Sequence, residues 1–365
     1  MTNPLVPPAD HKPEPEDALP ERLARAIALA GPIPVAQFMA AANAHYYGTR
    51  DPLGAEGDFT TAPEISQMFG ELIGLAIADI WMRSGRRGQA AYVELGPGRG
   101  TLASDALRAM ARAAFAPPVH FVETSPALRG RQQALLPTVI HHDTIASLPE
   151  QGPLLVVANE FFDALPVRQC IRVGDEWRER VLLAREEPGR FIPVAGYRRI
   201  ESGLPPIAAD APDGAILESP MAGAEIAYAL AQRIARQGGA AILIDYGYEG
   251  PALGDTLQAV KAHQFADPFA DPGEVDLTTH VDFTMLGNMA RQAGLRVHGP
   301  VGQGDFLRQL GIDARAAQLA ATAPDRADEV QAAAHRLTDA DAMGALFKVM
   351  AWTHPDWADP AGFEG

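Results

Sequence analysis

Acidic side chains are concentrated where the predicted parallel strands of this chain end, which is where ligands bind in such a sheet. The residues at these strand ends are Glu94, Glu123, Asp143, Asn159, Glu160 and Asp245. A row of carboxylates disfavours nucleotide phosphates and suits a cation, such as a sulfonium, a guanidinium or an ammonium group. The residue types therefore predict a pocket for a positively charged ligand or substrate.

A glycine-rich turn follows the first of these strands. The strand is predicted over residues 90–95, and Gly96, Gly98 and Gly100 then lead into a helix over 101–110. Glycines at such a turn supply backbone conformations that other residues avoid, and they let a ligand approach the main chain. The G-x-G-x-G spacing differs from the G-x-G-x-x-G of dinucleotide-binding turns, which disfavours an NAD-dependent dehydrogenase. A structural turn without a ligand is the alternative.

Two carboxylates flank this turn. Glu123 ends the second strand, predicted over 119–123, where an acid can accept hydrogen bonds from two ribose hydroxyls. Dinucleotides and S-adenosylmethionine both carry such a ribose, but Glu94 suits a sulfonium better than a pyrophosphate. These features predict S-adenosylmethionine as the cofactor. The predicted cofactor-binding residues are Glu94, Gly96, Gly98, Gly100, Glu123 and Asp143.

A second polar group follows the fourth strand, predicted over 154–160, on the other side of the point where the strand order reverses. Asn159, Glu160 and Asp163 lie there, in position to handle a methyl acceptor. Methyl transfer from a sulfonium is an in-line displacement, so the enzyme must hold the acceptor atom close and aligned. Paired carboxylates such as Glu160 and Asp163 can bind a guanidinium through two hydrogen bonds, which favours an arginine acceptor.

Neighbouring residues allow a structural as well as a functional interpretation. Phe161 and Phe162 either wall the pocket or pack in the core. Glu64 and Glu71 are weaker candidates for the acceptor site than Glu160.

The histidines give no strong indication of a metal. His141 and His142 are adjacent and point to opposite faces of a strand. His263 and His280 fall in or beside a long loop, where hydrogen-bonded loop histidines are a more frequent finding than metal ligands. No metal site is predicted.

Composition predicts a soluble globular protein. Of 365 residues, 47% are hydrophobic and 21% charged, and no stretch is long and apolar enough to span a bilayer. The net charge of −16 argues against a nucleic-acid partner and fits a basic protein or peptide substrate, although solubility alone would also explain it. Cys170, the single cysteine, excludes an internal disulfide. Without a signal sequence in view, we expect a cytoplasmic location.

Strands that alternate with helices from residue 90 onward predict an α/β fold with a doubly wound sheet. We expect a disordered tail over 1–17, a helical N-terminal region over 18–88, and a core over 89–365 with a β-rich insertion at about 167–214. Further core strands are predicted near 138–142, 240–247, 295–298 and 346–352, helices over 19–30, 222–237 and 281–293, and a long loop over 248–279.

A capping box from Thr61 to Glu64, with Pro63 in the first turn, predicts one helix that continues to about Met82. Gly70 and Gly74 would weaken this helix in isolation, so we expect close packing against a neighbour. Its exposed side is a candidate for a homodimer interface or for a cap over the site.

Several stretches, spread over about residues 20–352, resemble the MidA family, the bacterial relatives of a mitochondrial complex I assembly methyltransferase. They are residues 57–74, 94–102, 122–126, 159–166, 244–247, 254–258, 272–274, 276–283 and 346–349. Thr61 departs mildly from the family pattern, where we expect serine.

The resemblance implies an α/β, class I methyltransferase (Rossmann-like) fold with S-adenosylmethionine as cofactor. It also implies a protein-arginine methyltransferase that acts on a respiratory complex I subunit or a similar protein. By the same resemblance, Gly96, Gly98 and Gly100 form the cofactor loop, Glu123 binds the ribose, and Glu160 and Asp163 lie at the acceptor. The alternative is a non-catalytic assembly or chaperone factor that binds the cofactor without transferring a methyl group.

Overall fold

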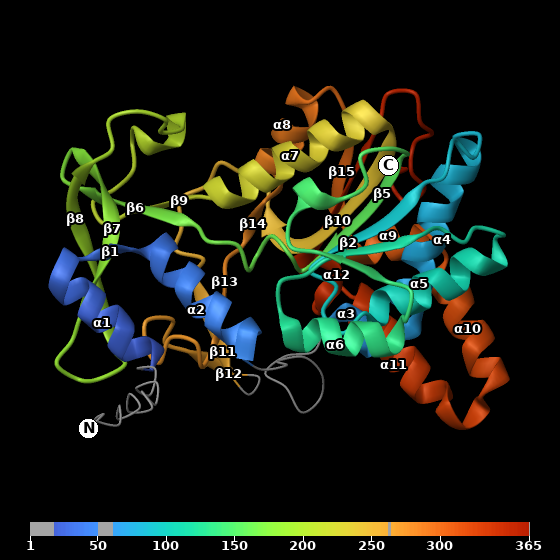
Figure 1. The fold of residues 1–365 in the computed structure, drawn as a ribbon, viewed down its shortest axis with the longest axis horizontal. Coiled ribbons are helices and arrows are strands. Elements are labelled where there is room, and N and C mark those ends of the chain that lie inside the picture. The colour runs from blue at the N-terminus through green and yellow to red at the C-terminus, as the bar shows by residue number, and fades with distance from the viewer. Residues whose placement is uncertain (1–17, 50–60, 262–263, 365) are drawn as a thin grey trace, which may run out of the picture.

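The computed structural model describes residues 18–49, 61–261 and 264–364 (Figure 1). The predicted disordered tail, the segment 57–60 of the first family motif and His263 lie outside the described residues.

Within these residues, an eight-stranded sheet forms the centre of the larger part of the molecule, in the order β15-β16-β10-β5-β2-β3-β4, with β14 beside β10. Its strands are β2 (Ala91–Leu95), β3 (Val119–Val122), β4 (Ile140–His142), β5 (Leu154–Asn159), β10 (Gly239–Tyr248), β14 (Val281–Asp282), β15 (Arg296–Gly302) and β16 (Phe347–Thr353). The strands from β4 to β10 are parallel, and β16 runs antiparallel between β10 and β15. The chain winds outward from β2 to β4 and then returns to β5, so the winding reverses between β2 and β5. The predicted doubly wound sheet is confirmed.

Helices cover both faces of this sheet because its central strands are apolar on both sides. Tyr92, Leu155 and Ile242 pack toward α4 (Gln67–Arg83) and α5 (Thr101–Arg112). The alternate residues pack toward α7 (Met221–Gln237) and α8 (Phe283–Gln292) on the other face (Figure 1). Between β3 and β5, the connections are α6 (Pro126–Leu135) and the 3₁₀ turn η1 (Ile145–Ser147).

The predicted single helix from Thr61 to Met82 is wrong. A short helix, α3 (Ala62–Ile65), ends at Ser66, whose backbone is extended, and α4 begins at the next residue. The Ser66 hydroxyl accepts a hydrogen bond from the Met68 amide at 3.2 Å, whereas Thr61 makes no side-chain cap. The cap that starts the long helix therefore lies five residues later than the capping-box pattern indicates.

Close packing at the two glycines of α4 is confirmed. A Cβ atom added to Gly70 would lie 2.7 Å from Cβ of Asp105, and one added to Gly74 would lie 2.4 Å from the carbonyl oxygen of Ala106. Both neighbours belong to α5, so the glycines let the two helices approach one another closely.

The second part of the molecule contains the N-terminal helices and two antiparallel sheets. Helices α1 (Leu19–Ala30) and α2 (Val35–Thr49) pack on the larger of these sheets. Its strands are β1 (Ile33–Pro34), β6 (Arg168–Val173), β7 (Glu176–Ala184), β8 (Phe191–Arg199) and β9 (Ile216–Ser219), and the turn η2 (Pro206–Ala208) precedes β9. The stretch predicted as a loop over 248–279 instead holds a small sheet of β11 (Gln258–Lys261), β12 (Gln264–Ala266) and β13 (Asp276–Thr278). These strands have three or four residues each, too short for a strand pattern to stand out.

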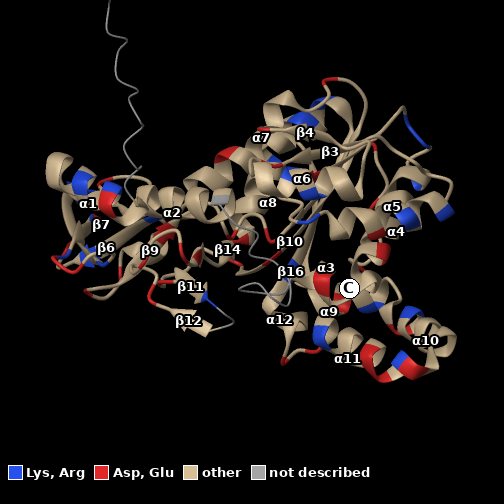
Figure 2. Cartoon of the chain, turned by 60° about the horizontal axis from the view of Figure 1, so that its bottom comes forward, with Lys and Arg blue, Asp and Glu red and all other residues tan. Residues whose placement is uncertain are grey.

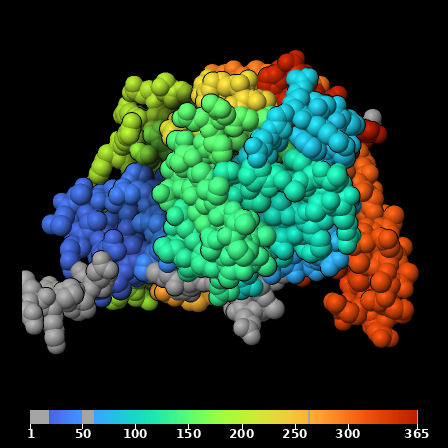
Figure 3. Space-filling view, turned by 45° about the vertical axis from the view of Figure 1, so that its right-hand side comes forward, coloured from blue at the N-terminus to red at the C-terminus, as the bar shows by residue number. Residues whose placement is uncertain are grey.

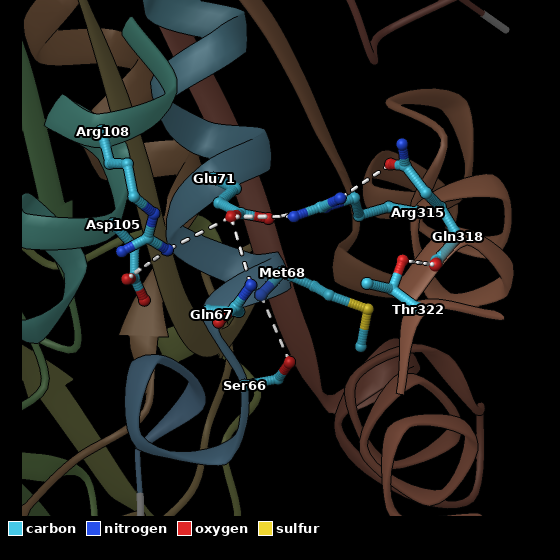
Figure 4. Close-up of polar contacts among 9 residues, drawn as sticks. All are labelled: Ser66, Gln67, Met68, Glu71, Asp105, Arg108, Arg315, Gln318 and Thr322. Carbon is cyan, nitrogen blue, oxygen red and sulfur yellow. Dashed lines mark hydrogen bonds and ion pairs between the residues drawn. The ribbon is translucent and has the colours of Figure 1, made fainter. Parts of the chain in front are cut away.

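Four helices near the C-terminus carry no prediction from the sequence: α9 (Gln303–Gln309), α10 (Ile312–Thr322), α11 (Ala327–Thr338) and α12 (Met343–Leu346), with the turn η3 (Pro324–Arg326). Figure 3 shows α10 and α11 as an orange ridge at the edge of the molecule. Arg315 of α10 donates to Glu71 of α4 through two hydrogen bonds of 2.7 and 3.0 Å, and Arg108 of α5 donates to it at 3.1 Å (Figure 4). This ion-pair network, in which Glu71 is buried and both arginines are partly exposed, attaches the ridge to the core.

Acidic segments, red in Figure 2, appear in both parts of the molecule, including the region of β9, β14 and β10. Among the described residues, none of the helices combines the length and the apolar character that a bilayer span requires.

Candidate active site

A cleft of about 1290 Å³ runs along the carboxyl ends of β2, β3, β4 and β5 and is bounded on its other side by α2 and the β11–β13 sheet. Of the predicted site residues, it brings together Glu94, Gly96, Gly98, Glu123, Asp143, Asn159, Glu160 and Asp163. Gly100 is not among the lining residues and instead caps the N-terminus of α5. The structure thus places these side chains in one cleft at the point where the winding reverses, and their individual roles stay predictions.

The turn after β2 requires glycine for backbone reasons. Gly96, Gly98 and Gly100 have φ angles of 61°, 56° and 83°, in the left-handed region that other residues rarely adopt. A Cβ atom on Gly96 would also lie 3.0 Å from Cδ2 of Phe161, so this glycine brings the turn close to the residues after β5.

Gln132, a buried residue that the sequence analysis missed, connects Glu123 to this glycine turn through hydrogen bonds. The Gln132 side-chain amide donates to the carbonyl oxygen of Gly98 at 2.6 Å and to Oε2 of Glu123 at 3.3 Å. Its Oε1 lies 2.9 Å from Nε2 of His141. Glu123 Oε1 accepts from the Ser125 amide at 2.8 Å. Gln132 is fully buried on α6, beside only one buried apolar residue of that helix, Leu128, so the sequence carried no clear signal for it.

Glu94 lies at the end of β2 and is only 3% exposed. Burial raises the pKa of its carboxyl to about 8, although a hydrogen bond from the Tyr92 hydroxyl opposes this shift. None of the arginine and lysine side chains that the structure describes forms an ion pair with Glu94, so a cationic ligand in the cleft would stabilise its carboxylate form.

Asp143 occupies the rim of the cleft, beyond the end of β4. Its side chain is 80% exposed and accepts a hydrogen bond from Arg129 at 2.7 Å. Arg129 also donates to the carbonyl oxygen of Glu123 at 2.7 Å, which ties the ends of β3 and β4 together.

The residues after β5 form the deepest acidic part of the cleft. Glu160 adopts a φ of 50°, unusual for a residue with a side chain, and such strain is concentrated at functional sites. The Asn159 side-chain amide donates to Oε1 of Glu160 at 3.1 Å. Among the residues that the structure describes, none forms a hydrogen bond with the buried Oδ1 of Asn159 or Oδ1 of Asp163, so both atoms are available to a ligand in the cleft.

The carboxyls of Glu160 and Asp163 both have raised pKa values. Burial, followed by repulsion from Asp163, raises the pKa of Glu160 to about 8. Burial raises the pKa of Asp163 to about 6, and the Tyr246 side chain opposes the shift. Asp245, which was also predicted at a strand end, does not line the cleft. Its carboxylate accepts hydrogen bonds from the backbone amides of Phe162, Asp163 and Tyr246 at 3.0 to 3.3 Å and so stabilises the turn after β5.

The positions of Phe161, Phe162, Glu64 and Glu71 show which of these residues line the cleft. Phe161 lines the cleft, whereas Phe162 is buried in the core beneath α7 and α8. Glu64 also lines the cleft but accepts a hydrogen bond from the Thr101 hydroxyl at 2.6 Å. Glu71 lies away from the cleft and is held by two arginines, so it is not an acceptor-site residue.

His280 lines the cleft and packs edge-on against Tyr246, with ring centroids 5.4 Å apart. Its possible metal partner His263 lies outside the described residues. Among the residues that the structure describes, no group of three histidine, cysteine or acidic side chains is arranged to hold a metal ion.

The donor set of the cleft fits S-adenosylmethionine. Glu123 offers carboxylate oxygens to a ribose, the left-handed glycines expose the main chain, and the buried carboxyl of Glu94 and the unpartnered Oδ1 of Asp163 suit a cation. The doubly wound sheet with one antiparallel strand and this cleft define a class I methyltransferase that depends on S-adenosylmethionine.

Comparison with known proteins identifies the family. The chain belongs to the family described as "Putative S-adenosyl-L-methionine-dependent methyltransferase", whose model matches residues 72–301. It is 37% identical over 376 residues to "Protein arginine methyltransferase NDUFAF7 homolog, mitochondrial" of Drosophila melanogaster, covering 92% of this chain and 84% of that protein. The human protein of this name is 33% identical, with coverage of 78% and 71%.

Solved structures agree with this result. A "likely methyl transferase" from Burkholderia thailandensis bound to S-adenosyl-homocysteine aligns with a TM-score of 0.79 and 26% identity, covering 95% of this chain and 92% of that one. The predicted fold class, cofactor and enzyme class are confirmed.

The expectation of a cytoplasmic protein is wrong, because these relatives are named as mitochondrial proteins. A lone cysteine indicates a reducing environment, and more than one compartment provides one, so cysteine usage does not locate the protein.

Proposed function

We propose that this enzyme methylates arginine side chains of a protein substrate, and that the buried carboxyls of Glu160 and Asp163 bind the acceptor guanidinium. The proposal is carried by the unpartnered Oδ1 of Asp163, which lines the cleft next to the cofactor turn. A buried carboxylate is costly unless a cation pairs with it, and a guanidinium pairs through two parallel hydrogen bonds. The names of the relatives, which describe protein arginine methyltransferases, support the same substrate class.

The binding roles follow from the positions of the side chains. Glu123 accepts from the ribose hydroxyls, with Gln132 and the Ser125 amide holding its two oxygens in place. Glu94 and the main chain at Gly96 and Gly98 form the floor of the cofactor site. Asp143 lies at its rim. Phe161 excludes water between this site and the acceptor site.

Bound S-adenosylmethionine supplies a methyl group on a positively charged sulfur, which leaves as the neutral thioether. Glu160 and Asp163 hold the guanidinium so that one of its terminal nitrogens faces this methyl group, and they concentrate the positive charge on the nitrogens that do not react. The reacting nitrogen forms the new bond to carbon and releases one proton to a carboxylate of the pair. Asn159 keeps Glu160 oriented through its 3.1 Å hydrogen bond.

The protein substrate that the family resemblance implies is a subunit of respiratory complex I. The net charge of −16 favours an exposed basic segment of such a subunit as the part that enters the cleft. A homodimer stays a prediction, which light scattering of the purified protein tests.

The test is transfer of a labelled methyl group to proteins of an extract from cells that lack this gene. Mass spectrometry should locate the label on arginine, on a complex I subunit. The double variant Glu160→Gln, Asp163→Asn should transfer at least about 100-fold more slowly while still binding S-adenosylmethionine. Glu187→Gln, an exposed change far from the cleft, serves as the control. Cofactor binding without any transfer would instead support the non-catalytic assembly role.

A further inference from the structure

A third buried carboxylate, not predicted as a site residue, shares the acceptor side of the cleft. Asp276 begins β13, is 4% exposed and lines the cleft together with Glu160 and Asp163. Tyr47 of α2 donates its hydroxyl hydrogen to Oδ1 of Asp276 at 2.7 Å. Two separate elements of the smaller part of the molecule thus supply an acid and its hydrogen-bond donor to a site otherwise built by the central sheet.

Two of the three carboxylates accept a hydrogen bond from a neighbouring side chain. The Asn159 amide donates to Glu160 and the Tyr47 hydroxyl donates to Asp276, while Tyr246 favours the ionised form of Asp163. Burial, followed by repulsion from these acids, raises the pKa of both tyrosines, so their hydroxyls stay protonated and act as donors at neutral pH. A hydrogen bond to one oxygen of a carboxylate holds the side chain in one orientation. A residue that binds a ligand needs such a fixed orientation.

Helix α2 is anchored at this point of the cleft. Asn43, one turn before Tyr47, donates its side-chain amide to the carbonyl oxygens of Leu277 at 2.7 Å and Ala164 at 2.9 Å, and accepts from the Leu277 amide at 3.2 Å. Leu277 follows Asp276 and Ala164 follows Asp163, so one asparagine fixes Tyr47 relative to both acids. The separate observation that points to a ligand is Oδ1 of Asp163, which is buried, unpartnered and faces the same cleft.

We propose that Asp276 is a third acceptor carboxylate that contacts the substrate guanidinium, and that Tyr47 is the residue that positions it. The inference rests on the proposed arginine specificity. A guanidinium has five N–H donors in one plane, so it can serve three carboxylates at once, whereas a lysine ammonium has three donors on a single atom. The acceptor site is therefore complete only when α2 and β13 are in place against the central sheet.

The experiment measures initial rates of labelled-methyl transfer to extract proteins as a function of extract concentration. Asp276→Asn should raise the half-saturating extract concentration about tenfold or more, with S-adenosylmethionine affinity unchanged within about twofold. Tyr47→Phe should give a smaller change in the same direction. Asp276→Glu, which keeps the charge, should recover part of the loss, and Tyr197→Phe, a 95% exposed site, is the matched control for Tyr47→Phe.

The pH dependence of the methylation rate distinguishes an electrostatic role of Asp276 from a role in folding. The groups that face Glu160 include Asp163 and Asp276, whose negative charges help raise its pKa, and the amides of Asn159 and Ala62, which oppose that shift. Removing the charge of Asp276 should lower the pKa of Glu160 and move the acid limb of the rate profile to lower pH, whereas a packing defect alone would not shift it in this direction.

Unchanged half-saturation and an unchanged acid limb in Asp276→Asn, with an active wild type, would overturn this inference alone. A wild type that labels no arginine would overturn the proposed function, and this inference with it. Tyr47→Phe retains the aromatic ring, so it keeps the test decisive if Asp276→Asn fails to fold.

Discussion

Replacing Gln132 by leucine tests whether a residue outside the predicted site holds the cofactor pocket together. The change keeps the approximate size of the side chain but removes two donated hydrogen bonds, one to Gly98 at 2.6 Å and one to Glu123 at 3.3 Å. It also leaves His141 without the oxygen that lies 2.9 Å from its Nε2. Since Gln132 is fully buried, water does not readily replace these contacts.

The magnitude follows from the groups left without partners. A buried polar group without its partner costs about 1–3 kcal/mol, and Glu123 retains its hydrogen bond from Ser125, so we expect a loss of about 2 kcal/mol in unfolding free energy. Glu123 would also lose its fixed orientation toward the ribose. A loss of about 1.4 kcal/mol in binding corresponds to a dissociation constant for S-adenosylmethionine about tenfold higher.

Isothermal titration measures this dissociation constant, and urea unfolding measures the stability. Gln133→Leu is the matched control, because it is the same change on the next, exposed residue of α6. Gln132→Glu should be worse than leucine, since a second carboxylate would face Glu123. If Gln132→Leu binds the cofactor as tightly as Gln133→Leu does, Gln132 does not position the ribose carboxylate.

Three further predictions concern packing, the ion pairs of Glu71 and pH. Gly74→Ala should lower the unfolding free energy by about 1–3 kcal/mol, because its Cβ would meet the Ala106 carbonyl at 2.4 Å, whereas Gly130→Ala, in open space, should not destabilise. Glu71→Ala should cost about 1–3 kcal/mol in urea unfolding, because the arginines it pairs with are partly exposed, and it should leave cofactor affinity unchanged. The kcat/KM for protein methylation should rise between about pH 6 and pH 8 as Asp163 and Glu160 ionise and gain the charge that binds a guanidinium.

The ion-pair and pH predictions each have a control or an outcome that would contradict them. Asp79→Ala removes an exposed ion pair with Arg83 and should change stability by less than about 1 kcal/mol. Burial alone would raise the pKa of Glu71, but hydrogen bonds from Arg315 and Arg108 outweigh it and lower the pKa. The Glu71 contribution should therefore be present at neutral pH and disappear as pH falls through the lowered pKa. A rate profile that is flat from pH 6 to pH 8 would contradict the acceptor role of Glu160 and Asp163.

Local patterns brought the residues predicted to bind the cofactor into one cleft because they lie close in the chain. The strand, the glycine turn and Glu123 belong to one βαβ unit, whose geometry places the acid beside the turn. The glycines of α4 likewise indicated their own close packing. A local rule failed at Thr61, since Ser66 supplies the cap of α4 instead.

The sequence did not indicate Tyr47 and Asp276, which we propose for the acceptor side, because they come from distant segments. Tyr47 and Asp276 are 229 positions apart, and no local pattern links them. Gln132 is an unremarkable polar residue until α6 packs over the glycine turn. Strands as short as β12 and β13 are stabilised by pairing with β11 more than by the strand propensity of their own residues.

A crystal structure with S-adenosylmethionine bound would test the central claim most directly. We predict the ribose hydroxyls on Glu123 and the methyl group directed toward Glu160 and Asp163. A ligand bound elsewhere, or one whose methyl group points away from these carboxylates, would contradict the account.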